Sequence, residues 1–132
     1  MAYHFSKTIK MPFEKAIDEV TLVLQQQGFG ILTTIDVAET LKKKLNVDFR
    51  KYKILGACNP QFAHQALSME PNIGVMLPCN IAVQEIGNGE VEVSAINPME
   101  TMAKSVTMKT PALKDLAAEV SERLKTAVEA LN

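Results

Sequence analysis

Short segments in which apolar and polar residues alternate recur along the chain, and this is the pattern of strands buried on one side. In the first segment, Tyr3–Ile9, the large apolar residues share one side: Tyr3, Phe5 and Ile9. In the second, Gly30–Ile35, one face carries Ile31, Thr33 and Ile35. The same reasoning predicts three further strands: Tyr52–Cys58, Cys79–Ile86 and Val91–Ile96.

Other segments repeat apolar residues every three or four positions, as amphipathic helices do. One follows Pro12, runs from Phe13 through Gln27 and ends at Gly28. The longest begins at Thr110-Pro111, where threonine serves as the cap and proline fits the first helical position. Its apolar stripe consists of Leu113, Leu116, Val120, Leu124, Val128 and Leu131.

Two shorter helices are predicted from the residues that begin them. Asp36 followed by Glu39 has the spacing of a capping box, and Asn46 is suited to end that helix in a left-handed conformation. We expect its Leu41 and Leu45 to point inward. Asn59-Pro60 begins the other helix, which ends before Pro71 and has an apolar stripe of Phe62, Ala63, Ala66 and Leu67.

Pro78 divides an apolar stretch that reads either as two strands, Ile73–Leu77 and Cys79–Ile86, or as one interrupted strand. A proline in the middle of a sheet removes a ladder hydrogen bond. We therefore expect an edge, a bulge or a bend at Pro78.

The connection Gly87-Asn88-Gly89 determines which residues face each other in the hairpin that follows. A two-residue turn would mix polar and apolar residues on each face, for example by pairing Val83 with Ser94. A three-residue loop with Gly89 left-handed would instead pair Val83 with Val93, Ile81 with Ala95 and Glu85 with Val91. We favour the second register, because it groups the small apolar residues and places Cys79 on their face.

These elements predict a single α+β domain that spans residues 1–132. Its mixed, mainly antiparallel sheet of about five strands packs against helices, and the chain ends in a long amphipathic C-terminal helix. The segment Met99–Lys109 has no clear period, so we predict a loop with a helical turn there.

Composition supports a folded domain and argues against two classes of partner. The chain is 47% hydrophobic and 22% charged, and its net charge of -1 gives no electrostatic reason to expect nucleic acid. Its one dense basic run, Lys42-Lys43-Lys44 continued by Arg50-Lys51 and Lys53, is more typical of a solvated helix face. No apolar segment approaches the roughly 20 residues that cross a bilayer, and the N-terminus lacks the pattern of a signal peptide. With two cysteines and no export signal, we expect a cytoplasmic protein with free thiols.

The two cysteines carry the most promising chemistry, because each is followed by an asparagine and lies near a proline. Cys58 comes directly before a predicted helix start, where N–H groups and the helix dipole favour a thiolate and lower the pKa of a thiol. Cys79 shares that location if the two strands are neighbours. A second interpretation is that both residues pack as small apolar side chains, as buried cysteines usually do.

Metal sites have weaker support. Cys58, Cys79 and His64 could supply three ligands, but they lack the close-paired spacing typical of zinc sites. Met99 and Met102, with Met69, Met76 and Met108, suit copper(I), although methionines more often fill gaps in a core. Because no catalytic motif is complete, the sequence identifies neither a reaction nor a cofactor.

The two Cys-Asn segments resemble the domain-of-unknown-function 302 (DUF302) family. Four stretches carry the resemblance, which spans nearly the whole chain: Gly28–Leu32 leading to Ile35–Val37, Tyr52–Pro60, Ile73–Ile81 and Val91–Pro98. The resemblance implies a small α+β fold, commonly assembled as a homodimer, and implies no catalytic activity. The positions that match the family motif are our ligand-binding candidates: Cys58, Asn59, Pro60, Pro78, Cys79 and Asn80.

Three functional hypotheses remain. The first is a cytoplasmic dimeric module that binds a small ligand or ion in a pocket lined by the Cys58-Asn59 and Cys79-Asn80 segments. The second is a structural or protein-interaction domain, in which these segments only fix the corners of strands. The third is a thiol-dependent enzyme, which requires a base such as His64 close to one cysteine.

Overall fold

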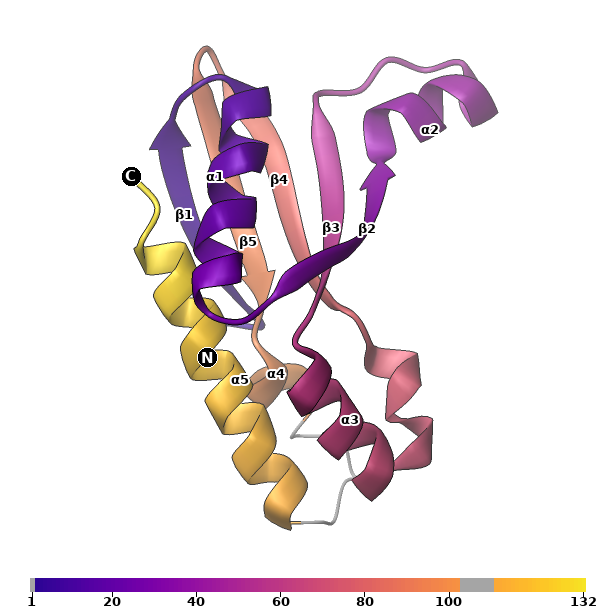
Figure 1. Ribbon diagram of the computed structural model, residues 1–132. Helices are drawn as coiled ribbons and strands as arrows, with labels where there is room; N and C mark the ends of the chain where they lie inside the picture. The colour runs from indigo at the N-terminus through magenta and orange to yellow at the C-terminus, as the bar shows by residue number, and fades with distance from the viewer. Residues whose placement is uncertain (1, 103–110) are drawn as a thin grey trace.

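A computed structural model describes residues 2–102 and 111–132 of the chain. Figure 1 shows its elements, which follow in this order: β1 (His4–Lys10), α1 (Phe13–Gln26), β2 (Gly30–Asp36), α2 (Val37–Leu45), β3 (Tyr52–Cys58), α3 (Pro60–Met69), the 3₁₀ helix η1 (Pro71–Met76), β4 (Cys79–Gly87), β5 (Glu90–Ile96), α4 (Pro98–Thr101) and α5 (Pro111–Glu129).

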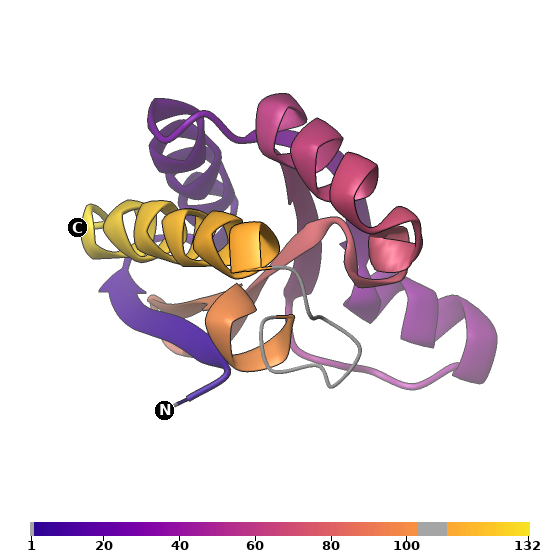
Figure 2. The ribbon, with the colours of Figure 1, turned by 90° about the horizontal axis from the view of Figure 1, so that it is seen from below.

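The strands form one sheet in the order β1-β5-β4-β3-β2, and every pairing between them is antiparallel. Helices α1 and α5 lie across the same face of this sheet (Figure 1, Figure 2). The main hydrophobic core fills the space between these two helices and the sheet. It includes Val83 and Val93 from the sheet, Val20 from α1 and Leu124 from α5. The predicted α+β fold is therefore confirmed.

The hairpin has the register that pairs apolar residues. Val83 lies opposite Val93 and Ile81 opposite Ala95, and Gly89 has a φ of 73°. Because side chains alternate between the two faces, this register directs all four apolar side chains into the core. The prediction made from the hydrophobic pattern is confirmed.

Local capping chemistry also behaves as predicted. The Asp36 carboxylate accepts a hydrogen bond from the Glu39 amide at 2.9 Å, and Asn46 ends α2 with a φ of 54°. Gly28 follows α1 with a φ of 85°, a conformation that glycine adopts at little cost.

The burial predicted for α2 is only partly correct, because Leu41 is half-buried but Leu45 is exposed. No residue of α2 is buried, and the Leu45 side chain is 66% exposed. Helix α2 leaves the sheet at the end of β2 and lies apart from α1, α3 and α5 (Figure 1). Its apolar stripe therefore has no neighbouring helix to cover it within the described part of the chain.

A β-bulge in β2 overturns the predicted face of that strand. Ile31 pairs with Ala57 and Thr33 with Gly56, so Leu32 is an extra residue between the two pairs. The extra residue reverses the alternation, and Thr33 and Ile35 lie on the face opposite Ile31.

The apolar side predicted for β1 is also only partly correct, because Tyr3 precedes the strand and is exposed.

The strand predicted over Ile73–Leu77 is a 3₁₀ helix instead. Pro71 occupies its first turn, and the Glu70 carboxylate accepts a hydrogen bond from the Asn72 amide at 3.3 Å. Val75 is 89% exposed, whereas Ile73 is buried and Leu77 is half-buried. Ile73 is thus the buried residue of η1, and Leu77 follows the end of this helix in an extended conformation.

The C-terminal helix has the predicted stripe as far as Val128, with Leu116 half-buried, and Leu131 is buried just after the helix ends at Glu129. The predicted helical turn after Asn97 corresponds to α4, while residues 103–110, including the predicted cap Thr110, lie outside the described residues. Within the described ranges, none of the helices is both long and apolar enough to cross a membrane.

Candidate functional site

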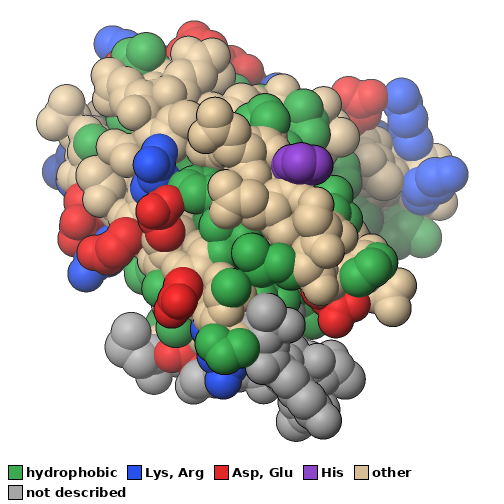
Figure 3. Space-filling model, turned by 60° about the horizontal axis from the view of Figure 1, so that its bottom comes forward, with side chains coloured by type: hydrophobic (Ala, Val, Ile, Leu, Met, Phe, Trp, Pro, Cys, Tyr) green, Lys and Arg blue, Asp and Glu red, His purple; other side chains and the backbone are tan. Residues whose placement is uncertain are grey.

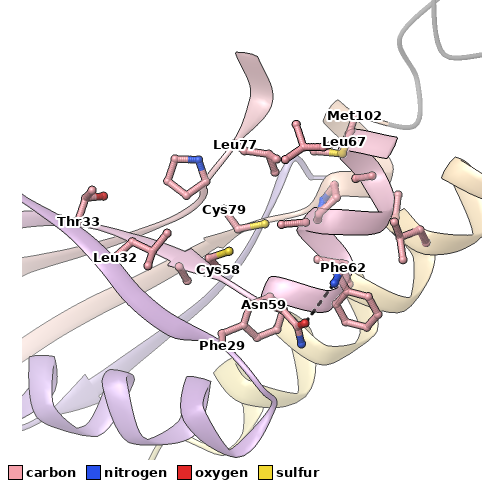
Figure 4. Close-up of a pocket in the computed structure, with 18 residues that line it drawn as sticks. Phe29, Leu32, Thr33, Cys58, Asn59, Phe62, Leu67, Leu77, Cys79 and Met102 are labelled. Atoms are coloured by element: carbon pink, nitrogen blue, oxygen red, sulfur yellow. Dashed lines mark hydrogen bonds between the residues drawn. The ribbon is translucent and has the colours of Figure 1, made fainter. Parts of the chain in front are cut away.

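A cavity of about 350 Å³ opens where one end of the sheet meets α3, α4 and α5. It lies between the main core, which includes Phe29 and Val120, and a second hydrophobic cluster, which includes Ala66 and Met102. Figure 4 shows its lining, which consists of Phe29, Leu32, Thr33, Ala57, Cys58, Asn59, Phe62, Ala63, Ala66, Leu67, Leu77, Pro78, Cys79, Pro98, Met102, Leu116, Ala117 and Val120. We call this cavity the cysteine pocket.

The wall of the cysteine pocket is almost entirely apolar. Thr33 and Asn59 are the polar side chains among the described lining residues, beside the two thiols. The described lining includes no aspartate, glutamate, lysine, arginine or histidine. Such a wall favours an apolar ligand over a charged one.

The pocket has an exposed rim and a buried floor. Leu32, Thr33 and Leu67 are exposed, whereas Ala66 and Ala117 are buried. Hydrophobic side chains also gather on the lower end of the molecule, the end to which α3 belongs (Figure 3). The exposed side of the pocket therefore lies between β2 and α3.

Asn59 fixes the wall that carries Cys58. Its side-chain oxygen accepts hydrogen bonds from the amides of Gln61 at 3.1 Å and Phe62 at 3.2 Å, and so caps α3 as predicted. The sequence predicted that the amides at this helix start would stabilise a Cys58 thiolate. In the structure, the Gln61 and Phe62 amides donate to Asn59 instead. A side chain at Gly28 would approach Asn59 Nδ2 to 2.8 Å, so this glycine leaves room for the cap.

Pro78 and Cys79 form the neighbouring wall at the start of β4. Cys79 lies opposite Ala57 in the β3–β4 ladder, and Asn80 lies opposite Gly56. Pro78 packs over Gly56, where a Cβ atom would come within 2.7 Å of Pro78 Cγ. The Leu77–Pro78 peptide bond is cis.

The two thiols point into the same cavity from neighbouring strands (Figure 4). Burial, and to a lesser extent the nearby Cys58, raises the pKa of the Cys79 thiol from an ordinary 9.0 to about 11. Cys79 is therefore protonated at neutral pH and is a poor nucleophile. The geometry supports an apolar role for this residue.

This burial predicts a pH dependence of stability that can be measured. Between about pH 9 and pH 11 the unfolded chain releases the Cys79 proton while the folded chain retains it, so the free energy of unfolding should fall by about 2–3 kcal/mol over this range. Urea unfolding of the wild type and of Cys79→Ala, at pH 8 to 11, measures this. The variant should lack that part of the decrease, and the prediction is wrong if both proteins lose the same amount.

Three of the sequence candidates lie outside the pocket lining. Pro60 is exposed in the first turn of α3, and Asn80 projects from the opposite face of the sheet, beside Ala82 and Ser94. His64 is exposed on α3, so it does not join the two cysteines as a third metal ligand. Among the described residues, no three His, Cys, Asp or Glu side chains are grouped so that they could hold a metal ion.

The methionines predicted as copper ligands are not gathered at the pocket either. Met102 lines it, but Met69, Met76 and Met99 do not. Met108 lies outside the described residues. The described methionines thus do not form one site at the thiols.

Sequence reasoning did not find the opposite walls of the pocket. Leu32 and Thr33 face it because of the β2 bulge, which the alternating pattern does not predict. Ala66 and Ala117 leave space because they are small residues on apolar helix stripes, a signal that was present in the sequence. Their convergence depends on how α3 and α5 pack.

Comparison with known proteins identifies the family. No curated protein matches the chain significantly. The crystal structure of an uncharacterized conserved protein DUF302 from Bacillus stearothermophilus is similar, with a TM-score of 0.85 and 30% sequence identity over 98% of each chain. The profile of the domain of unknown function DUF302 matches residues 5–131. This chain therefore belongs to the DUF302 family.

Proposed function

We propose that this domain binds a small ligand in the cysteine pocket. The observation that carries the proposal is a cavity of about 350 Å³ with an almost wholly apolar wall, to which both cysteine segments contribute. Its volume falls within the range of small-molecule sites, which are concave and mostly apolar. Burial of ligand surface, at roughly 25 cal/mol per Å², would supply the affinity.

The pocket gives less support to thiol-dependent catalysis. A thiol is activated by a base, a nearby positive charge or a helix N-terminus. The described lining residues provide no base or charge, and the Gln61 and Phe62 amides at the start of α3 are engaged by Asn59. The Cys79 thiol is buried, and its raised pKa keeps it protonated. Of the original hypotheses, ligand binding therefore fits the geometry better than catalysis, and a purely structural domain is the competing explanation.

Fluorescence titration with N-phenyl-1-naphthylamine tests the proposal, because this uncharged dye becomes brighter in apolar surroundings. We expect saturable binding to the wild type. Ala117→Leu adds three carbons at the pocket floor and should weaken binding about tenfold or more. The matched control is Ala118→Leu on the exposed side of the same helix, which should bind as the wild type does.

Two results would count against a binding pocket. One is the absence of saturable dye binding to the folded wild type. The other is equal binding by the Ala117→Leu and Ala118→Leu variants, which would place the dye elsewhere. Circular dichroism of each variant confirms that the comparison is made between folded proteins.

We also propose that the domain forms a homodimer through the α2 region. Supporting this, a group of exposed apolar residues lies on β2, α2 and the segment after it: Ile35, Leu45, Val47 and Phe49. Lys42 and Asp48 pair with each other at 3.2 Å on the same surface, so the apolar group and not an unmatched charge is what a second copy would cover.

Sedimentation equilibrium tests the dimer. We expect twice the mass of the 14.5 kDa chain for the wild type, and the monomer mass for Leu45→Glu. Leu22→Glu, at an exposed leucine on α1, is the control and should remain dimeric. A monomeric wild type would contradict the proposal.

We also propose a reducing, cytoplasmic location, which is supported by the two cysteines that form no disulfide.

A further inference from the structure

The cysteine pocket differs from most small-molecule sites in how little polar surface its wall presents. Typical sites place a few polar groups against the ligand to fix its orientation. Here the Asn59 side-chain oxygen is already engaged by two backbone amides, its Nδ2 lies beside Gly28, and Thr33 stands on the exposed rim. The floor therefore offers a ligand little except apolar contact.

From this wall we infer that the ligand is an uncharged aliphatic chain, such as an alkyl or acyl group, that enters tail first and leaves its polar head at Thr33. The inference rests on the proposed function and specifies its ligand class.

Charge decides which part of a ligand can reach the floor. Phe29, Ala66 and Ala117 at the floor are buried, and the described lining carries no ionised side chain that could pair with a charge. An unpaired charge in such surroundings is strongly disfavoured. The part of a ligand that reaches the floor must consequently be uncharged and apolar.

Size decides the length of the chain. An apolar cavity of about 150 Å³ accommodates benzene, which has six carbons. At the same packing, the cavity of about 350 Å³ accommodates roughly fourteen carbons as an upper limit. A flexible chain packs less densely, so we expect the pocket to be filled at about 8–14 carbons.

Direction follows from where the lining residues lie. They extend from Thr33 on β2 to Met102 beside α4, with Cys58 and Cys79 between them (Figure 4). Most of the wall is aliphatic or sulfur-bearing, and methionine and cysteine side chains adapt to irregular apolar shapes. A chain that lies along this line contacts both thiols without a covalent step.

Competition against N-phenyl-1-naphthylamine with primary alcohols of 4 to about 16 carbons tests the inference. Each added methylene should lower the dissociation constant roughly fourfold until the pocket is full, after which the constant should level off. The break should fall at about 8–14 carbons. Alkylammonium ions and carboxylates of the same length should bind no more tightly than the alcohols.

A floor variant locates the tail of the chain. Ala66→Leu adds three carbons to the floor and should move the break to a chain shorter by about three carbons. Ala118→Leu, outside the pocket, should leave the break in place. If Ala66→Leu does not fold, the series on the wild type still decides the question.

The outcomes separate the two proposals. Dye binding that is independent of alcohol length, or that naphthalene displaces as well as every alcohol does, would overturn the aliphatic-chain inference while leaving a binding pocket. A break in the wild type that Ala66→Leu leaves unchanged would also overturn it. Absence of dye binding would instead overturn the proposed function, and the inference with it.

Discussion

Replacing Gly56 with alanine should lower the free energy of unfolding by about 1–3 kcal/mol. A Cβ atom at this position would lie 2.7 Å from Pro78 Cγ and would also collide with Thr33 Oγ1. Thr33 can rotate away, but Pro78 is a rigid ring at the start of β4 and must move with its backbone. The substitution therefore forces apart the walls that carry Thr33 and Pro78.

Urea unfolding of Gly56→Ala beside Gly30→Ala measures this effect. Gly30 is the matched control, because it lies on the adjacent strand β2 and a Cβ atom there meets nothing within 4 Å. We expect the control to change stability by less than about 0.5 kcal/mol. If the two variants lose the same stability, the close approach at Gly56 is not what constrains this position.

Replacing Asn97 with alanine should cost about 2–3 kcal/mol of stability. The Asn97 side chain is 2% exposed, and its oxygen accepts hydrogen bonds from the Met99 amide at 3.1 Å and the Ser121 hydroxyl at 2.9 Å. It therefore caps α4 and joins the end of β5 to α5. Alanine would leave a buried hydroxyl without this acceptor.

A double-mutant cycle with Ser121→Ala checks the origin of that cost. The two residues share one hydrogen bond, so the double variant should lose less stability than the sum of the two single variants, by about 0.5–3 kcal/mol. Thermal or urea unfolding of the four proteins gives this difference. Additive losses would show that Asn97 stabilises the fold without its bond to Ser121.

Local chemistry explains which parts of the fold could be predicted from the sequence. Asp36 and Asn46 lie at the ends of α2 because their own side chains and backbone preferences favour those positions. The pairing of Val83 with Val93 followed from strand periodicity, since the alternative register mixes polar and apolar residues on each face.

Tertiary packing explains the parts that could not be predicted. An extra residue at Leu32 reverses the faces of β2, and apolar alternation alone does not reveal it. The apolar stripe of α2 indicates that a surface should be covered but does not say by what, so Leu45 is exposed in the single chain. Neither feature is encoded within a few residues.

The candidate site could be predicted only in part, because it too depends on tertiary packing. Cys58 and Cys79 share a pocket because β3 and β4 are neighbours, as the sequence interpretation required. Asn80 should not have been a candidate for the same site as Cys79, because neighbouring side chains in a strand point to opposite faces of the sheet. The residues that make the pocket hollow and apolar, such as Ala66 and Ala117, come together only through the packing of α3 and α5.

The central claim is that the cysteine pocket binds an apolar chain, and chemical-shift mapping tests it most directly. Two-dimensional ¹H–¹⁵N spectra of the wild type, titrated with 1-decanol, report which backbone amides sense the ligand. We predict saturable shifts at Ala57, Cys79 and Ala117 around the pocket, and small shifts at Ala82 and Ser94 on the open face of the sheet. Shifts that cluster on the open face, or that never saturate at any residue, would contradict the claim.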